Sequence, residues 1–361
     1  MMGKQMTSYF VLEIHEAKKM LKFITRASIC FMAIIFLMIA FTKVTQAQSS
    51  SAIRANQGRL GLLTATTSGT YVEIGADIAR ALDNRSNFRI VPYLSSGAIQ
   101  NLNDLMTYRD ADIALVNADT LMNFKVRNPD DPRIAKLSYL AKVYGSELHL
   151  IVSRDSGIRT VSDLADRKVA IGQNGSGTWL TSQLVMRALG VQADITPMPN
   201  DVALEALKDG KIDATFFLTG KPSAIFQRIK SDEGLTLIGI PFSQALSGIY
   251  KAAEFTPDDY PGLVTDKFVP TISVDVILAV YGRYPVGSNE YKLRSNFVRQ
   301  LRANMAPLQF PPNHPKWKQF SFSEEVPGWD KAEATMQVLS DTAENTSAGP
   351  SIADLMKQGF E

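Results

Sequence analysis

The residues best suited to chemistry in this sequence form two copies of one short motif, Ser-Gly-Thr followed by an aromatic residue. Each copy comes after a short apolar run and before a segment of helical periodicity. A strand, a Ser/Gly/Thr loop and a helix in this order direct backbone N–H groups and the positive end of a helix dipole at one place, which suits a carboxylate ligand. The glycines let a ligand approach the main chain, and the aromatic rings supply flat walls. The residues concerned are Ser68, Gly69, Thr70 and Tyr71 in the first copy, and Gly175, Ser176, Gly177, Thr178 and Trp179 in the second.

Helix capping is the alternative interpretation of both motifs. Ser and Thr cap helices in proteins that bind nothing at that position, so capping is the better interpretation of either copy alone. Two copies at matching positions favour a binding site instead. We therefore expect the hydroxyls of Thr70 and Thr178 to contribute to ligand binding.

Two further loops could add to this site. The first consists of Ser96, Gly97 and Ala98, ahead of a helix predicted over 99–106, with Asn117 at the end of a nearby strand. The second is the Thr219-Gly220-Lys221-Pro222 loop, ahead of a helix predicted over 223–230, and Pro222 suits a first helical turn. Lys221 is either a cation for the ligand or a solvated loop lysine. The second-loop residues counted as candidates are Thr219, Gly220, Lys221 and Pro222.

Signals for catalysis or metal binding are weak. Beyond residue 47 the sequence has two histidines, His149 and His314, and their positions do not give metal-ligand spacing. A nucleophile elbow of the G-x-S-x-G type and a phosphate-binding P-loop are both missing. The one cysteine, Cys30, lies in the apolar segment near the N-terminus. The sequence thus predicts a binding protein without catalytic residues, metal or cofactor.

The elements that must position these residues alternate between short apolar runs and helix-period segments, which is typical of an α/β fold with mainly parallel strands. The predicted strands are Arg59–Leu63, Phe88–Val91, Ile113–Val116, Leu148–Val152, Lys168–Ile171, Ala214–Leu218, Thr236–Ile240 and Ser273–Val280. Helices are predicted after both Ser-Gly-Thr motifs, to Leu82 and to Leu189, and over 290–300, 331–339 and 352–358.

The two halves of this pattern resemble each other beyond the motifs. Each half has a helix, a charged turn and then a strand opened by aspartate, Asp112 in the first and Asp213 in the second. A repeat of this size predicts two lobes of similar build, each a mainly parallel sheet flanked by helices. We expect 59–150 and 270–361 to form lobe 1 and 151–269 to form lobe 2, with hinges near 146–153 and 270–280.

The N-terminal segment is typical of a secretory signal peptide. Lys18, Lys19, Lys22 and Arg26 lie just before the apolar run Ala27–Phe41, and small residues follow it up to Ala47. We expect residues 1–47 to be a cleaved signal peptide, with a start at Met1 or Met20, and 48–58 to be a linker; a retained membrane anchor is the alternative.

The overall composition is that of a globular protein, not a polycation. Apolar residues make up 45% and charged residues 20%, and the formal net charge is +2. Residues 1–47 hold six basic and two acidic residues, so the remaining chain has 32 basic and 34 acidic residues. This balance argues against nucleic acid as a partner.

The sequence resembles the TAXI-type solute receptors of tripartite ATP-independent periplasmic (TRAP) transporters. The resemblance covers about 60–240 and rests on the segments 68–82, 95–105, 110–121, 160–178 and 206–222, in the family's order and spacing. Where the family often has a second aromatic residue after its Gly-Thr-Tyr, this chain has Val72.

This resemblance implies a two-lobed periplasmic binding protein fold of the type II-like kind, with hinge strands that join the lobes, and it implies no catalysis. It implies capture of a small organic anion, such as a dicarboxylate, a 2-oxoacid or an amino acid like glutamate, and delivery to a membrane permease driven by an ion gradient. Two other functions stay open at this point. The fold also serves receptors of ATP-driven (ABC) importers and sensor kinases, and an exported enzyme could be built on it.

Overall fold

The computed structural model describes residues 58–83 and 88–347, together with Met32. From Gly58 onward the chain forms one compact unit. Its ten strands join in a single sheet, along which the order is β2-β1-β3-β10-β4-β7-β5-β6, with β8 on β4 and β9 on β10. Within the described residues, none of the helices is long and apolar enough to cross a membrane. The predicted signal peptide and the helix predicted over 352–358 lie outside the described residues.

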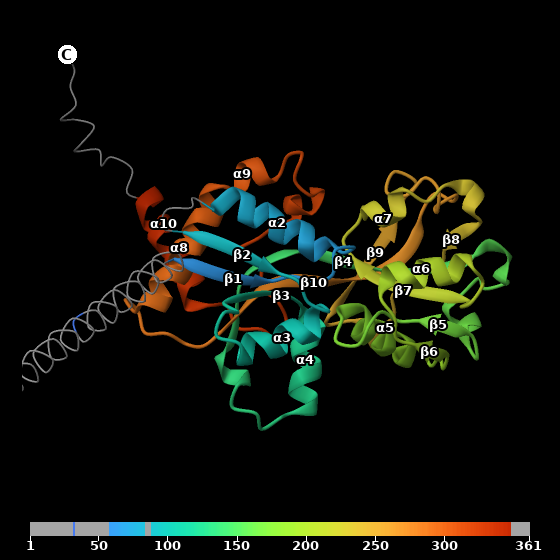
Figure 1. Ribbon diagram of the computed structural model, residues 1–361, viewed down its shortest axis with the longest axis horizontal. Coiled ribbons are helices and arrows are strands. Elements are labelled where there is room, and N and C mark those ends of the chain that lie inside the picture. Colours follow the sequence, from blue (N-terminus) through green and yellow to red (C-terminus); the bar gives the residue numbers. More distant parts are fainter. Residues whose placement is uncertain (1–31, 33–57, 84–87, 348–361) are drawn as a thin grey trace, which may run out of the picture. The chain divides into compact units, whose positions relative to one another are not determined.

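The first lobe is built on three parallel strands with β1 in the middle. Every residue of β3 is buried, which explains why this strand is a continuous apolar run in the sequence. Helix α2 lies on one side of the strands, and α3 and α4 lie on the other (Figure 1). The elements are β1 (Arg59–Leu63), α2 (Thr70–Leu82), β2 (Arg89–Tyr93), α3 (Ala98–Thr107), β3 (Ile113–Asn117) and α4 (Ala118–Arg127).

The second lobe repeats this plan, with three parallel strands and β5 in the middle. Its elements are β5 (Lys168–Ala170), α5 (Gly177–Ala188), β6 (Asp194–Thr196), α6 (Asn200–Lys208), β7 (Ala214–Thr219) and α7 (Ala224–Gln227). The aspartates of the repeat accept equivalent backbone hydrogen bonds in both lobes. Asp112 accepts a hydrogen bond from the N–H of Gly61 at 2.8 Å, and Asp213 accepts one from the N–H of Lys168 at 2.8 Å.

Two long antiparallel strands join the lobes, β4 (Leu137–Ser153) and β10 (Val269–Tyr281). From Leu137 to Glu147, β4 pairs with β10; from Glu147 to Val152 it pairs with β7. Glu147 is therefore the residue at which β4 passes from one set of partners to the other. The shorter strands β8 (Leu235–Leu237) and β9 (Tyr250–Phe255) extend this region.

The C-terminal helices pack on the first lobe. Contacts join α8 to α2, α10 to α8, and α10 to β4. The helices are α8 (Asn289–Ala303), α9 (Met305–Leu308) and α10 (Glu333–Ser347). Short 3-10 helices complete the described chain: η1 (Ile134–Lys136), η2 (Arg154–Ser156), η3 (Val161–Leu164), η4 (Ser231–Glu233), η5 (Gln244–Leu246) and η6 (Pro315–Gln319).

The structure corrects several predicted elements. β4 and β10 are much longer than the apolar runs that predicted them, and β6 and β9 were not predicted. The helix predicted over 223–230 is the single turn of α7, which begins at Ala224 after the N-cap Ser223. Pro222 therefore lies before the helix and does not occupy its first turn.

Candidate functional site

A small cavity of about 50 Å³ lies where the loops of the two lobes meet. Its walls come from the loops after β1, β2 and β3 in the first lobe, from β4, and from both the Ser-Gly-Thr loop and β7 in the second. The lining residues are Ala65, Thr66, Gly69, Thr70, Tyr71, Ser96, Gly97, Ala98, Asn117, Tyr144, Ser176, Gly177, Thr178, Asn200, Phe217, Leu218 and Thr219.

Four helices begin at this cavity, because the first residue of each lines it. They are α2 at Thr70, α3 at Ala98, α5 at Gly177 and α6 at Asn200. Their N-terminal ends carry partial positive charge, and the residues that line the cavity include no charged side chain. The resulting field favours an anion without the strength of a full ion pair.

Two side chains in the wall offer hydrogen-bond donors. The hydroxyl of Tyr144 and Nδ2 of Asn117 are buried and have no partner among the described residues. The hydroxyl of Tyr71 donates to Oδ1 of Asn117 at 2.8 Å, which leaves Nδ2 as the free donor. Burial raises the pKa of both tyrosines well above the usual value, so both hydroxyls keep their protons. Unpaired buried donors of this kind are costly unless something binds them.

The lobes are closed around the cavity by direct hydrogen bonds. Oγ1 of Thr70 lies 2.9 Å from Oγ1 of Thr219, and the N–H of Gly220 donates to Thr70 Oγ1 at 3.1 Å. On the other side, two amides of α3, those of Ile99 and Gln100, donate to the carbonyl of Gly175 at 3.0 and 3.1 Å. Because these bonds join residues of opposite lobes, the structure is a closed form.

A buried carboxylate adds to this closure. Asp119 on α4 accepts hydrogen bonds from Thr181 on α5 at 2.6 Å and from the hydroxyl of Tyr250 on β9 at 2.9 Å. Its exposed fraction is 0%, and burial raises its pKa. The first lobe is thus tied to the second by a buried carboxyl group whose partners are hydroxyl groups.

The predicted site residues divide into two groups. Gly69, Thr70, Tyr71, Ser96, Gly97, Ala98, Asn117, Ser176, Gly177, Thr178 and Thr219 line the cavity. The others do not line it: Ser68, Gly175, Trp179, Gly220, Lys221 and Pro222. Within the second group, Gly175 and Gly220 still bond across the lobes, whereas Trp179 lines a separate groove.

Lys221 forms hydrogen bonds within the protein and does not point into the cavity. Its ammonium group donates to Asp259 at 2.9 Å and to the carbonyl of Glu254 at 2.6 Å, and its backbone N–H donates to Glu147 at 2.9 Å. Glu147 is also paired with Lys316 at 2.5 Å, and both side chains are buried. These pairs hold the second-lobe loop and the C-terminal segment against β4, beside the cavity.

Both histidines beyond residue 47 are uncharged and buried. Nδ1 of His149 lies 3.0 Å from the carbonyl of Glu147, so it carries the proton, and Nε2 accepts from the hydroxyl of Tyr260 at 2.8 Å. Burial lowers the pKa of His149 to about 3 and that of His314 to about 4. In the described part of the chain, acidic, histidine and cysteine side chains do not form a group of three or more that could hold a metal ion.

A profile of the NMT1-like family matches residues 62–287, which is more than half of the chain and includes every residue that lines the cavity. The chain belongs to the NMT1-like family. For this NMT1-like chain, the matched region contains both Ser-Gly-Thr loops, β4 and β10, while α8 to α10 follow it.

Several solved structures are similar to this NMT1-like protein at low sequence identity. The periplasmic binding protein BugD has a TM-score of 0.49 and 14% identity over 83% of this chain and 97% of its own. A TctC solute-binding protein from Polaromonas has a TM-score of 0.43 and 16% identity, covering 80% and 96%. The amino acid ABC transporter substrate-binding protein AbpA from Streptococcus pneumoniae, bound to L-arginine, has a TM-score of 0.38 and 16% identity, covering 74% and 97%.

Proposed function

We propose that this protein is an exported solute receptor that holds a small organic anion in the cavity between its lobes and does not transform it. The proposed ligand is a dicarboxylate, a 2-oxoacid or an amino acid such as glutamate. The observation that carries the proposal is the convergence of four helix N-termini on a cavity whose donors Tyr144 and Asn117 lack partners. The lobes that close on it are proposed to be 59–150 with 270–361, and 151–269.

Binding in this cavity requires movement of the lobes. A volume of about 50 Å³ is well below the ~300–1,000 Å³ typical of small-molecule sites. A ligand with several non-hydrogen atoms therefore needs the lobes further apart than they are here. The hydrogen bonds of Thr70 and Gly175 would open first, and β4 and β10 would bend near Glu147. Closure on the ligand would then replace some of these bonds by contacts with it.

The proposed receptor delivers its ligand to a membrane partner. The resemblance to TAXI receptors supports a TRAP-type permease as that partner, in the periplasm, after removal of residues 1–47. Membership of the NMT1-like family supports ligand binding in general and is neutral on the type of permease.

The test is a melting-temperature screen of the protein lacking residues 1–47. Dicarboxylates, 2-oxoacids and amino acids are added one at a time, and a ligand at a hundred times its Kd should add ~2.7 kcal/mol to the free energy of unfolding. Absence of a shift with every member of the panel would contradict the proposal.

The variant Tyr144→Phe makes the test specific to the cavity. Because the hydroxyl of Tyr144 has no protein partner, its removal should leave the free protein at least as stable. It should nevertheless weaken binding of the anion about tenfold, since a hydrogen bond to a charged group contributes ~1.5–3 kcal/mol. Tyr108→Phe, at an exposed tyrosine outside the cavity, is the matched control and should bind normally. Equal binding by both variants would contradict the proposal that the ligand lies in this cavity.

A further inference from the structure

A second and larger cavity lies between α4 and α5, and we call it the α4/α5 groove. Its volume is about 450 Å³, within the range of ~300–1,000 Å³ typical of small-molecule sites. One wall is a face of α4, the other is a face of α5, and the floor is the segment that leads into β9. The lining residues are Asp119, Met122, Asn123, Val126, Arg127, Trp179, Leu180, Gln183, Leu184, Arg187, Ala188, Ala245, Leu246, Ile249 and Tyr250.

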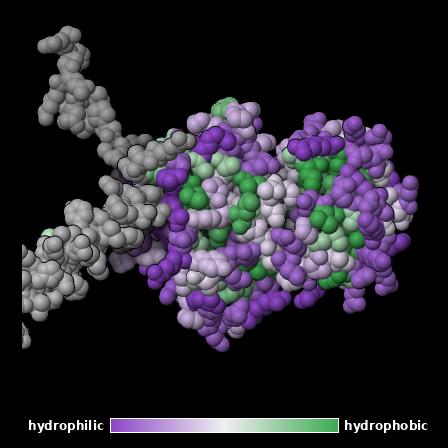
Figure 2. Space-filling view, viewed as in Figure 1, coloured by the Kyte–Doolittle hydropathy of each residue, from purple (hydrophilic) through white to green (hydrophobic). Residues whose placement is uncertain are grey.

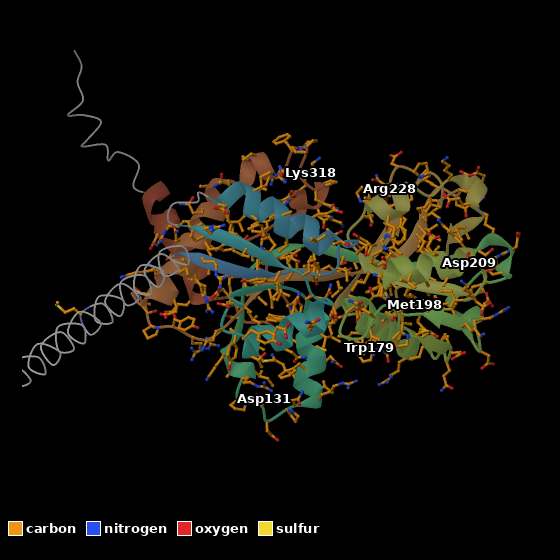
Figure 3. All side chains as sticks on the ribbon, in the orientation of Figure 1. Asp131, Trp179, Met198, Asp209, Arg228 and Lys318 are labelled. Carbon is orange, nitrogen blue, oxygen red and sulfur yellow. The ribbon has the colours of Figure 1, made fainter. Side chains whose placement is uncertain are left out.

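The walls of the groove are mainly apolar, although some of their side chains are exposed to solvent. On α4, Met122 is 42% exposed and Val126 is 77% exposed, which leaves large apolar side chains in contact with water. Opposite them lie Trp179 and Leu184 of α5, and Figure 3 labels Trp179 at the side of α5 nearest α4. Figure 2 shows that hydrophobic residues gather in separate patches on the visible face of the described chain, among hydrophilic ones. An apolar surface of this kind favours an apolar ligand.

The charge at the mouth of the groove is positive. Arg127 and Arg187 lie in the last turns of α4 and α5, one on each wall, and both are exposed. Nε of Arg127 donates to Asn123 at 3.2 Å, and neither arginine forms an ion pair with any described residue. Two guanidinium groups without a carboxylate partner suit an anionic head group.

The α4 wall carries the one acidic residue in the lining, Asp119, which is fully buried. Its Oδ2 accepts two hydroxyl hydrogen bonds, and its Oδ1 has no partner among the described residues. Burial also raises its pKa, which favours the uncharged acid. A positively charged ligand would meet two arginines before it came near this carboxyl group.

We propose that the α4/α5 groove binds a monocarboxylate with an unbranched apolar body, of the medium-chain fatty acid type. The carboxylate would lie between Arg127 and Arg187, and the alkyl chain would pack on Met122, Trp179 and Leu246. Eight residues separate Asp119 from Arg127, which is ~12 Å along the axis of α4 at 1.5 Å per residue. This length suits decanoate better than acetate or butyrate. The site is separate from the interlobe cavity, but α4 belongs to the first lobe and α5 to the second, so the groove has both walls in the closed form and the proposal rests on the closure described above.

The test is titration calorimetry of the protein lacking residues 1–47 with butyrate, octanoate and decanoate. Affinity should rise along this series by about fourfold for each additional buried CH₂. The double variant Arg127→Gln/Arg187→Gln should bind decanoate at least tenfold more weakly. Arg228→Gln, at an exposed arginine outside the groove and labelled in Figure 3, is the control and should bind decanoate normally.

Decylammonium, which has the same tail and the opposite charge, decides between head groups. Binding of decylammonium equal to or tighter than that of decanoate would overturn the proposal, as would equal decanoate affinity in the double variant and the control. The melting-temperature screen is repeated on the double variant, which should keep its response to small acids. A missing response in both proteins would contradict the interlobe site alone.

Discussion

The two Ser-Gly-Thr loops have the same sequence and the same place in their lobes, but their side chains form different bonds. Oγ1 of Thr70 bonds to Thr219 and Gly220, across the gap between the lobes. Oγ1 of Thr178 accepts from the N–H of Leu218 at 3.0 Å, within its own lobe. The first loop therefore contributes to closure, whereas the second contributes to the stability of its own lobe.

The serines differ in the same way. Ser176 caps α5, since its hydroxyl accepts from the N–H of Trp179 at 3.0 Å. Ser68 does not cap α2; its hydroxyl lies 3.3 Å from that of Thr66. The capping interpretation of the motif thus fits one copy and not the other. The backbones differ as well, because α2 begins at the threonine of its motif, Thr70, whereas α5 begins one position earlier, at the glycine Gly177.

The glycines should show the largest difference between the loops. A Cβ added at Gly177 would lie 2.3 Å from Oδ1 of Asn117 in the other lobe, whereas one added at Gly69 has no atom within 4 Å. Gly177→Ala should prevent full closure and weaken ligand binding more than tenfold, because opening the lobes relieves the clash. Gly69→Ala should close and bind like the unmodified protein.

Small-angle X-ray scattering with and without ligand measures this closure. The radius of gyration of Gly177→Ala should stay at its open value when ligand is added, while that of Gly69→Ala falls. Identical compaction of both variants would show that the approach of Gly177 to Asn117 does not limit closure.

The threonines should differ in what each one stabilises. Thr178→Val leaves the partly buried N–H of Leu218 without a partner in either form of the protein, so the free energy of unfolding should fall by ~1 kcal/mol. Thr70→Val leaves the N–H of Gly220 unpaired in the closed form alone, so its main effect should be weaker closure. Urea denaturation measures the first effect and scattering the second. A larger loss of stability in Thr70→Val than in Thr178→Val would reverse our assignment.

The serines should show the smallest difference. Ser176→Ala removes a helix cap and should lower the free energy of unfolding by ~1 kcal/mol, while Ser68→Ala should change it by less than ~0.5 kcal/mol. Both values come from urea denaturation without ligand. Equal effects would mean that Ser68 has a structural task that its bond to Thr66 does not explain.

The sequence was most informative where burial makes a strand uniformly apolar. β1 begins and ends at the predicted residues, and β3 and β7 differ from their predicted ranges by one residue. The first half of β4 escaped prediction because it contains Lys142 and Glu147, which interrupt the apolar pattern. Their partners, Glu324 and Lys316, lie more than 160 residues away in the chain, so no local signal marks these polar residues as part of a buried strand.

The cavity residues were also only partly predictable from the sequence. Its loops follow predicted strands and contain glycine and hydroxyl residues, which is why most of them were candidates from the sequence. Tyr144 and Asn200 carry no such signal, since one lies inside a long strand and the other at the start of α6. They line the cavity because β4 and the start of α6 also pass beside it. Lys221 was a candidate from the sequence but does not line the cavity. Its ammonium group binds Asp259, which lies 38 residues further along the chain, so no local pattern indicated this pairing.

The position of β10 has a consequence for the order in which the chain folds. This strand lies between β3 and β4 in the sheet, yet it begins at Val269, long after both have been made. During synthesis, the edges of β3 and β4 that pair with β10 therefore stay unpaired until most of the chain has emerged from the ribosome. For a protein that crosses a membrane unfolded, as the proposed export requires, a central strand that is made late keeps the first lobe incomplete and the chain suitable for transport.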